Sequence, residues 1–133
     1  MVVWLVVANN LPAQQGPAAD WSRPRSIESG GIRVYYPRAW HATADGITIV
    51  VSSPSTWIWL ANYGPAHGEE FPPRPKHFEL RDEDFGFQSC GFGFEGWNLG
   101  FTDHGQVVQA VIKQYPGMRE SYAAELLDRL EIS

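Results

Sequence analysis

The sequence is poor in cysteine and in charge. Its single cysteine, Cys90, excludes an intrachain disulfide and a zinc site built from several cysteines. Cys90 falls in a segment with strand character, so we expect a buried thiol. Charged residues make up 19% of the 133 residues, and the formal net charge is -5. Because nucleic-acid binding needs a surplus of Lys and Arg on one face, this composition argues against DNA and RNA as partners.

The N-terminal apolar run is short. It covers residues 1–8, whereas a membrane span needs about twenty apolar residues, and it lacks the basic residues with which signal peptides begin. Two interpretations stay open, a strand packed into the domain or the end of a longer hydrophobic anchor. A Pro- and Gln-rich stretch follows. We therefore expect an apolar segment with a linker over residues 1–20, and a single α+β domain over residues 21–133.

Catalytic and metal-binding patterns are also scarce. Ser52, Ser53 and Ser55 lack the glycines of a nucleophile elbow, and the acidic run at residues 82–84 lacks the spacing of a calcium loop. The histidines are far apart and form no ligand pair on a helix. They are His41, His67, His77 and His104. We expect no metal, no cofactor and no catalytic set.

Aromatic residues are abundant, at 14% of the chain with six Trp. Alternating apolar residues predict strands over residues 32–36, 47–51 and 56–61, with a hairpin turn at Asp45-Gly46. The alternation returns near the C-terminus and predicts a three-stranded antiparallel meander with one apolar face. Its strands centre on Phe92 and Phe94, on Trp97, Leu99 and Phe101, and on Val108, Ala110 and Ile112, with turns at Glu95-Gly96 and at 103–105.

The last part of the sequence has helical periodicity. Apolar residues three and four positions apart predict one helix over residues 118–130, with Gly117 as its N-cap. They are Tyr122, Ala123, Leu126, Leu127 and Leu130. Because this stripe has the width of a core-facing helix, we expect it to cover the apolar face of the meander. The predicted fold is α+β, an antiparallel sheet of about six strands packed against the C-terminal helix.

One aromatic group is a candidate contact surface. Trp57 and Trp59 point to the same side of their strand, and Tyr63 lies close beyond. Next comes a loop at residues 64–77 that contains four prolines. The alternative is that both indoles simply close the core. The predicted partner surface comprises Trp57, Trp59, Tyr63, His67, Arg74 and His77.

Two motifs resemble a known family. The sequence from Tyr36-Pro37 to Trp40 is similar to the "YP-x-x-W" that follows the first strand of PsbP-like domains, and residues 123–132 resemble their closing helix. This superfamily includes a photosystem II extrinsic subunit, Mog-type Ran-binding proteins and actinobacterial envelope lipoproteins. The resemblance spans residues 30–132. It implies an antiparallel sheet flanked by helices, a non-enzymatic accessory role, and an extracytoplasmic or membrane-associated location; a cytoplasmic location stays open.

These observations favour a non-catalytic binding or accessory module. We expect it to present its aromatic surface and Pro-rich loop to a protein or another cell-envelope component, and to meet a membrane only through an N-terminal anchor. One alternative is a small-ligand or enzymatic pocket that uses His41, His104 and a carboxylate near Asp103. Another is a purely structural ectodomain of a larger membrane-anchored protein. The sequence carries no signal for an oligomeric state.

Overall fold

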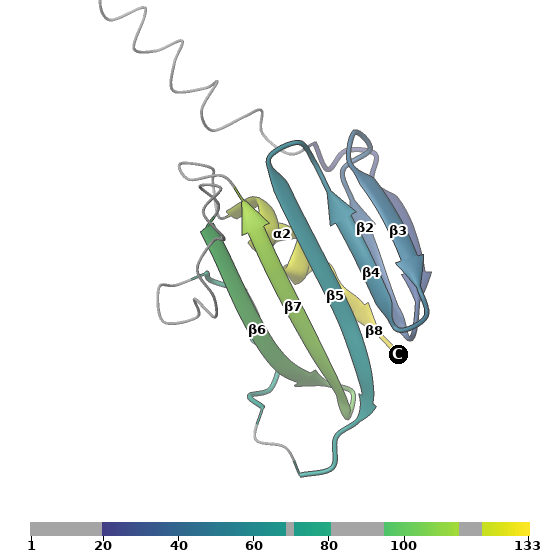
Figure 1. Ribbon diagram of the computed structural model, residues 1–133, viewed down its shortest axis with the longest axis vertical. Helices are drawn as coiled ribbons and strands as arrows, with labels where there is room; N and C mark the ends of the chain where they lie inside the picture. The colour runs from purple at the N-terminus through teal and green to yellow at the C-terminus, as the bar shows by residue number, and fades with distance from the viewer. Residues whose placement is uncertain (1–19, 69–70, 81–94, 115–120) are drawn as a thin grey trace, which may run out of the picture.

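The computed structural model describes residues 20–68, 71–80, 95–114 and 121–133. These residues form eight strands and one short helix (Figure 1). In chain order they are β1 (Arg25–Ser29), β2 (Ile32–Tyr36), β3 (His41–Asp45), β4 (Thr48–Ser52), β5 (Thr56–Pro65), β6 (Glu95–Asp103), β7 (Gln106–Gln114), α2 (Ser121–Asp128) and β8 (Glu131–Ile132).

The strands form two antiparallel sheets. One has three strands in the order β1-β2-β8, and the other has five in the order β3-β4-β5-β7-β6. Figure 1 shows α2 and β8 behind β5 and β7, and β2 behind β3 and β4, so the five-stranded sheet makes one layer, and the small sheet with the helix makes the other. The expected α+β fold with one sheet of about six strands is wrong. The fold is mainly β, because polar residues 25–29 and the last residues add strands and the helix spans only Ser121–Asp128.

The predicted strands in the first half are confirmed. β2 has the predicted bounds, and β5 begins where expected and continues to Pro65. The hairpin at Asp45-Gly46 is confirmed as well, because Asp45 pairs with Thr48 across a two-residue loop. Gly46 has a φ of 62°, which glycine adopts without strain.

The C-terminal meander is confirmed in part. β6 and β7 pair along their whole length, and their turn lies at His104-Gly105, where both residues have positive φ. The predicted turn at Glu95-Gly96 is wrong, because β6 is continuous from Glu95 and Gly96 pairs with Lys113. The predictions that lie outside the described residues concern residues 1–8, the linker before Trp21, residues 82–84, Cys90, Phe92, Phe94 and the helix start at Gly117.

The core lies between the two layers. Alternate residues of the five-stranded sheet point inward, and Ile49, Ile58 and Ile112 are fully buried there. The stripe on α2 packs against them, with Leu126 and Leu127 also fully buried. Burying each of these side chains contributes about 1.5–3 kcal/mol to the free energy of folding, relative to leaving it exposed. The predicted cover of the apolar sheet face by the C-terminal helix is confirmed.

Asn62 connects the turns of the two sheets. Its side chain is 5% exposed; Nδ2 donates to the carbonyl of Gly30 at 2.9 Å, and Oδ1 accepts from the N–H of Gly64 at 2.8 Å. The backbone N–H of Asn62 donates to the carbonyl of Ile47. One residue of β5 therefore holds the β1–β2 turn, the β3–β4 turn and the irregular end of its own strand.

Trp21 attaches the beginning of the described chain to α2. Its indole N–H donates to a carboxylate oxygen of Glu125 at 2.9 Å, and the guanidinium of Arg129 lies 4.1 Å from the centre of its ring. Contact of a cation with an aromatic face contributes about 0.5–1 kcal/mol at an exposed site.

Among the helices of the described residues, none is long and apolar enough to cross a bilayer.

Candidate functional site

The candidate site is the outer face of the five-stranded sheet, on the side opposite the core. Trp57 and Trp59 alternate with the buried Ile58 on β5, so both indoles lie on this face, where they are half-buried. Trp59 pairs with Val50 on β4 and with Val111 on β7. Directly opposite pairs in a sheet lie on the same face, so two apolar residues flank the indole, which stays partly accessible.

Trp57 also contacts a cation. The ammonium group of Lys113, its partner on β7, lies 5.1 Å from the centre of the Trp57 ring. This distance is within the range in which the ring quadrupole attracts a cation. The Lys113 side chain is therefore laid over the indole at this end of the outer face.

Tyr63 begins a row of hydrogen bonds across three strands. Its ring is 54% exposed, and its hydroxyl donates to Oε1 of Gln109 on β7 at 2.8 Å. Nε2 of Gln109 in turn donates to Oδ1 of Asn98 on β6 at 2.8 Å. The three side chains are thereby linked in one row, and each bond has the length of a well-formed hydrogen bond.

Phe71 comes to the outer face from the Pro-rich loop. The carbonyl of Pro72 accepts from the N–H of Thr102 at 2.9 Å, and the N–H of Arg74 donates to the carbonyl of Thr102 at 2.8 Å, so this part of the loop pairs with the edge of β6. The Phe71 ring then lies over Gly100, where a Cβ atom would approach it within 2.8 Å. Phe71 remains 42% exposed. Because Gly100 has no side chain, the Phe71 ring can occupy this space.

Tyr63 and Phe71 line a shallow hollow of about 330 Å³ on the outer face, which we call the Tyr63–Phe71 hollow. Its other lining residues are Asn98, Gly100, Val107, Val108 and Gln109. Among the described residues, no charged side chain belongs to this lining. Two exposed rings and a few neutral polar groups are the composition of a binding hollow.

A second groove of about 590 Å³ follows the edge of β6 between the strand and the Pro-rich loop. It shares Asn98 and Gly100 with the Tyr63–Phe71 hollow. We call it the edge groove; its remaining lining residues are Pro72, Pro73, Pro75, His77, Phe78, Glu79, Leu99 and Phe101. The two depressions therefore meet at the edge of β6.

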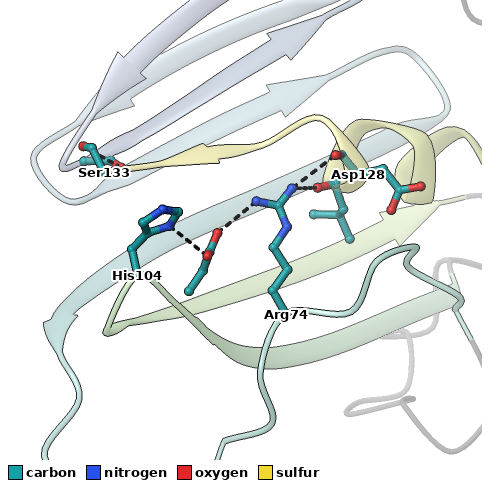
Figure 2. A network of polar contacts seen from close by, with 7 residues as sticks. Arg74, His104, Asp128 and Ser133 are labelled. Carbon is teal, nitrogen blue, oxygen red and sulfur yellow. Dashed lines mark hydrogen bonds and ion pairs between the residues drawn. The ribbon is translucent and has the colours of Figure 1, made fainter.

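Arg74 points away from the outer face. Figure 2 shows its side chain extending from the loop toward the end of α2 near Asp128. Its guanidinium donates to the carbonyls of Leu127 and Asp128 at 3.1 and 3.2 Å, and forms an ion pair with Asp103 at 3.0 Å. The last carbonyls of a helix lack partners within the helix, so Arg74 satisfies two of them. Its role in the fold is to join the loop to α2.

Three further contacts hold this region together. The N–H of Phe78 donates to Oδ1 of Asp128 at 2.7 Å, and Oδ2 of Asp128 lies 3.4 Å from Nδ1 of His77. At the β6–β7 turn, Nδ1 of His104 lies 2.9 Å from Oδ1 of Asp103. His77 is largely exposed despite its contact. These carboxylates therefore fix the loop and the β6–β7 turn.

The structure brings only part of the predicted partner surface together. Trp57, Trp59 and Tyr63 share the outer face, whereas Arg74 turns to α2. His67 and His77 are exposed on the loop, outside the Tyr63–Phe71 hollow. The sequence reasoning missed Phe71, Gln109 and Asn98. The alternation of Gly100 with Leu99 and Phe101 was the one signal that a small residue on the outer face leaves room for a ring.

The alternative pocket of His41, His104 and a carboxylate is not assembled. His41 begins β3 at one edge of the five-stranded sheet, while His104 follows β6 at the other edge. Asp103 does contact His104, but its second oxygen is held by Arg74. Within the described residues, no three His, Cys, Asp or Glu side chains lie close enough to hold a metal ion.

Comparisons with known proteins assign this chain to no family. No family model matches it, and searches of curated proteins and of solved structures found no significant match.

Proposed function

We propose that this protein is a non-catalytic binding module that contacts a protein or another cell-envelope component through the outer aromatic face, defined by Trp57, Trp59, Tyr63 and Phe71. The observation that carries the proposal is the Tyr63–Phe71 hollow, in which two exposed rings flank neutral polar side chains already held in place by hydrogen bonds.

The exposure of the rings supports a contact role. Tyr63 and Phe71 are two of the three large hydrophobic residues that are exposed among the described residues; the third, Ile47, lies at the tip of the β3–β4 hairpin. Single exposed apolar residues are ordinary, whereas apolar groups gathered around a hollow mark a binding surface. Trp59 extends this apolar surface along the same strand.

The chemistry of the hollow supports binding without catalysis. Its polar groups are the phenol of Tyr63 and the amides of Gln109 and Asn98, which donate and accept hydrogen bonds without changing charge near neutral pH. An acid–base or nucleophilic mechanism needs a titratable group poised beside a reacting atom. Hydrogen-bonded amides and aromatic rings are better suited to positioning a partner.

A capture experiment tests the proposal. The intact protein and its Tyr63→Ala/Phe71→Ala variant are immobilised and exposed to a cell-envelope extract, and the retained mass is measured. We expect the double variant to lose most of the retained material while its thermal unfolding stays cooperative. Ile47→Ala is the matched control, because it removes an exposed apolar side chain outside the hollow. Equal retention by all three proteins would contradict the proposal.

A further inference from the structure

We infer that the Tyr63–Phe71 hollow takes an uncharged carbohydrate chain. This inference rests on the proposed function, because it names the class of partner that the same surface binds. It depends on three properties of the hollow: the lack of charge among its described lining residues, the hydrogen-bonding groups that its side chains leave available, and its connection to the edge groove.

The lining selects against a charged ligand. None of the seven described residues that line it carries a formal charge near neutral pH. A charged group that enters such a site loses water without gaining an ion partner, and this costs free energy. The nearest charged side chain along β7, Lys113, belongs to the other end of the face and lies over Trp57. An uncharged partner avoids the desolvation penalty.

The hydrogen-bond row specifies what the ligand must offer. The Tyr63 hydroxyl uses its hydrogen on Gln109, so its oxygen remains an acceptor. Asn98 uses Oδ1 to accept from Gln109, and its Nδ2 makes no hydrogen bond to the rest of the described chain. The row thus offers an acceptor at one end and a donor at the other. A sugar hydroxyl both donates and accepts, so neighbouring hydroxyls match both ends.

The two rings match the rest of a sugar. A pyranose or furanose ring carries hydroxyls at its rim and C–H groups on its faces. The negative face of an aromatic ring attracts the slightly positive hydrogens of such C–H groups, as it attracts the edge of another ring. Tyr63 and Phe71 expose about half of their surfaces beside the hydrogen-bond row. They can therefore stack on the sugar while the amides contact its hydroxyls.

The connection to the edge groove favours a chain of sugars over a single one. The hollow and the edge groove share Asn98 and Gly100, so a ligand bound beside Phe71 can continue over the edge of β6. A hollow of about 330 Å³ is at the small end of the range of ligand pockets, roughly 300–1,000 Å³. The additional groove provides a path for the units that follow.

A proline-rich peptide is the competing occupant, because such peptides also dock in grooves lined by aromatic residues. Its proline residues lack N–H groups, so it presents mostly carbonyl acceptors. These acceptors match Nδ2 of Asn98 but leave the Tyr63 oxygen without a donor. The Tyr63 oxygen, which a proline-rich peptide leaves unmatched, therefore favours a hydroxyl-rich ligand.

The test is a glycan array on which the full chain is probed. The array carries neutral glucans, mannans, galactans and arabinans, uronic-acid-containing and sulfated glycans, and a decaproline peptide. We expect binding to at least one neutral glycan. We expect Tyr63→Ala and Phe71→Ala each to weaken this binding by about tenfold or more, as loss of a central aromatic contact does. Binding to charged glycans only, to decaproline only, or to nothing on the array would overturn the inference.

Conservative variants separate hydrogen bonding from simple apolar contact. Tyr63→Phe keeps the ring and removes the oxygen, and we expect it to weaken binding of the neutral glycan by about five- to tenfold. Ile47→Ala should bind like the unchanged protein. Unchanged binding by Tyr63→Phe would contradict the hydrogen-bonding basis of the inference. Thermal unfolding of each variant confirms that any loss is not a loss of folding.

Treatment of the captured envelope material distinguishes this inference from the proposed function. Periodate cleaves vicinal diols and should abolish retention of a carbohydrate, whereas protease treatment should leave it unchanged. If protease removes the retained material and periodate does not, the carbohydrate inference fails and the binding function stands. If the Tyr63→Ala/Phe71→Ala variant captures as much as the unchanged protein, both fail.

Discussion

The Phe71 ring occupies the space that a side chain at position 100 would need. Two of its ring carbons lie 2.8 and 2.9 Å from the position that a Cβ atom on Gly100 would take. Such distances are too short for van der Waals contact, so the ring and a larger residue cannot both keep their places. Glycine on the outer face of β6 is therefore a condition for the Tyr63–Phe71 hollow.

Gly100→Ala should consequently displace the Phe71 ring and leave the sheet in place. Phe71 is partly exposed and can swing away, and alanine suits a strand interior better than glycine. We expect the free energy of unfolding to change by less than about 1 kcal/mol. Hydroxyl-radical footprinting should show faster oxidation of Phe71. Thr43→Ala, an exposed change on β3, is the control, and equal oxidation of Phe71 in both variants would contradict the stated geometry.

Asn62→Ala should destabilise the protein more than the same substitution does at an exposed position. The change leaves the Gly30 carbonyl and the Gly64 N–H without the amide that bonds both of them. Loss of these two part-buried hydrogen bonds costs about 1–3 kcal/mol, which urea unfolding followed by tryptophan fluorescence measures. Asn98→Ala removes the same side chain from an exposed position and should cost no more than about 0.5 kcal/mol. Similar losses in both variants would refute the connecting role of Asn62.

Arg74→Gln should reduce stability. At temperatures at which the variant is still folded, its binding of the neutral glycan should stay unchanged. The change removes the ion pair with Asp103 and the hydrogen bonds to the last carbonyls of α2. We expect a loss of about 1–3 kcal/mol in the free energy of unfolding. His77→Gln, on the same loop, should be neutral because its side chain is largely solvent-exposed. A large loss of binding in folded Arg74→Gln would instead place Arg74 in the partner surface.

Ile58 and Trp59 are neighbours on opposite faces of β5, and their alanine variants should differ accordingly. Ile58 is fully buried, so Ile58→Ala should cost about 2–5 kcal/mol through lost burial and a cavity. Trp59 is larger but only half-buried on the outer face, and Trp59→Ala should cost less than Ile58→Ala. Chemical unfolding compares the two directly. The reverse order would mean that the indole belongs to the core.

Local periodicity predicted the strands that have one buried face. β2 alternates Ile32, Val34 and Tyr36 inward, and its bounds follow from the sequence. β1 carries the same backbone structure with only Ile27 apolar, because it is an edge strand with little to bury. It gives no alternation to detect. The short β8 gives none either, so local periodicity does not predict the second sheet and favours an α+β fold instead.

The candidate site was predictable only where it depends on one strand. Trp59 and Tyr63 lie on β5, and alternation alone places them near each other. Phe71 reaches the same face because Pro72 and Arg74 pair with Thr102, a contact between distant parts of the chain. No local pattern encodes such a contact. Arg74 was misleading for a similar reason: a basic residue among prolines is usually solvated, but here the end of α2 provides acceptors for it.

The hydrogen bond from Trp21 to Glu125 determines on which side of the five-stranded sheet the described chain begins. It fastens the beginning of the described chain to α2, which lies behind the five-stranded sheet (Figure 1). The indoles of β5 and the ring of Phe71 lie on the opposite side of this sheet, so the anchoring contact at Trp21 and the outer aromatic face do not compete for the same surface.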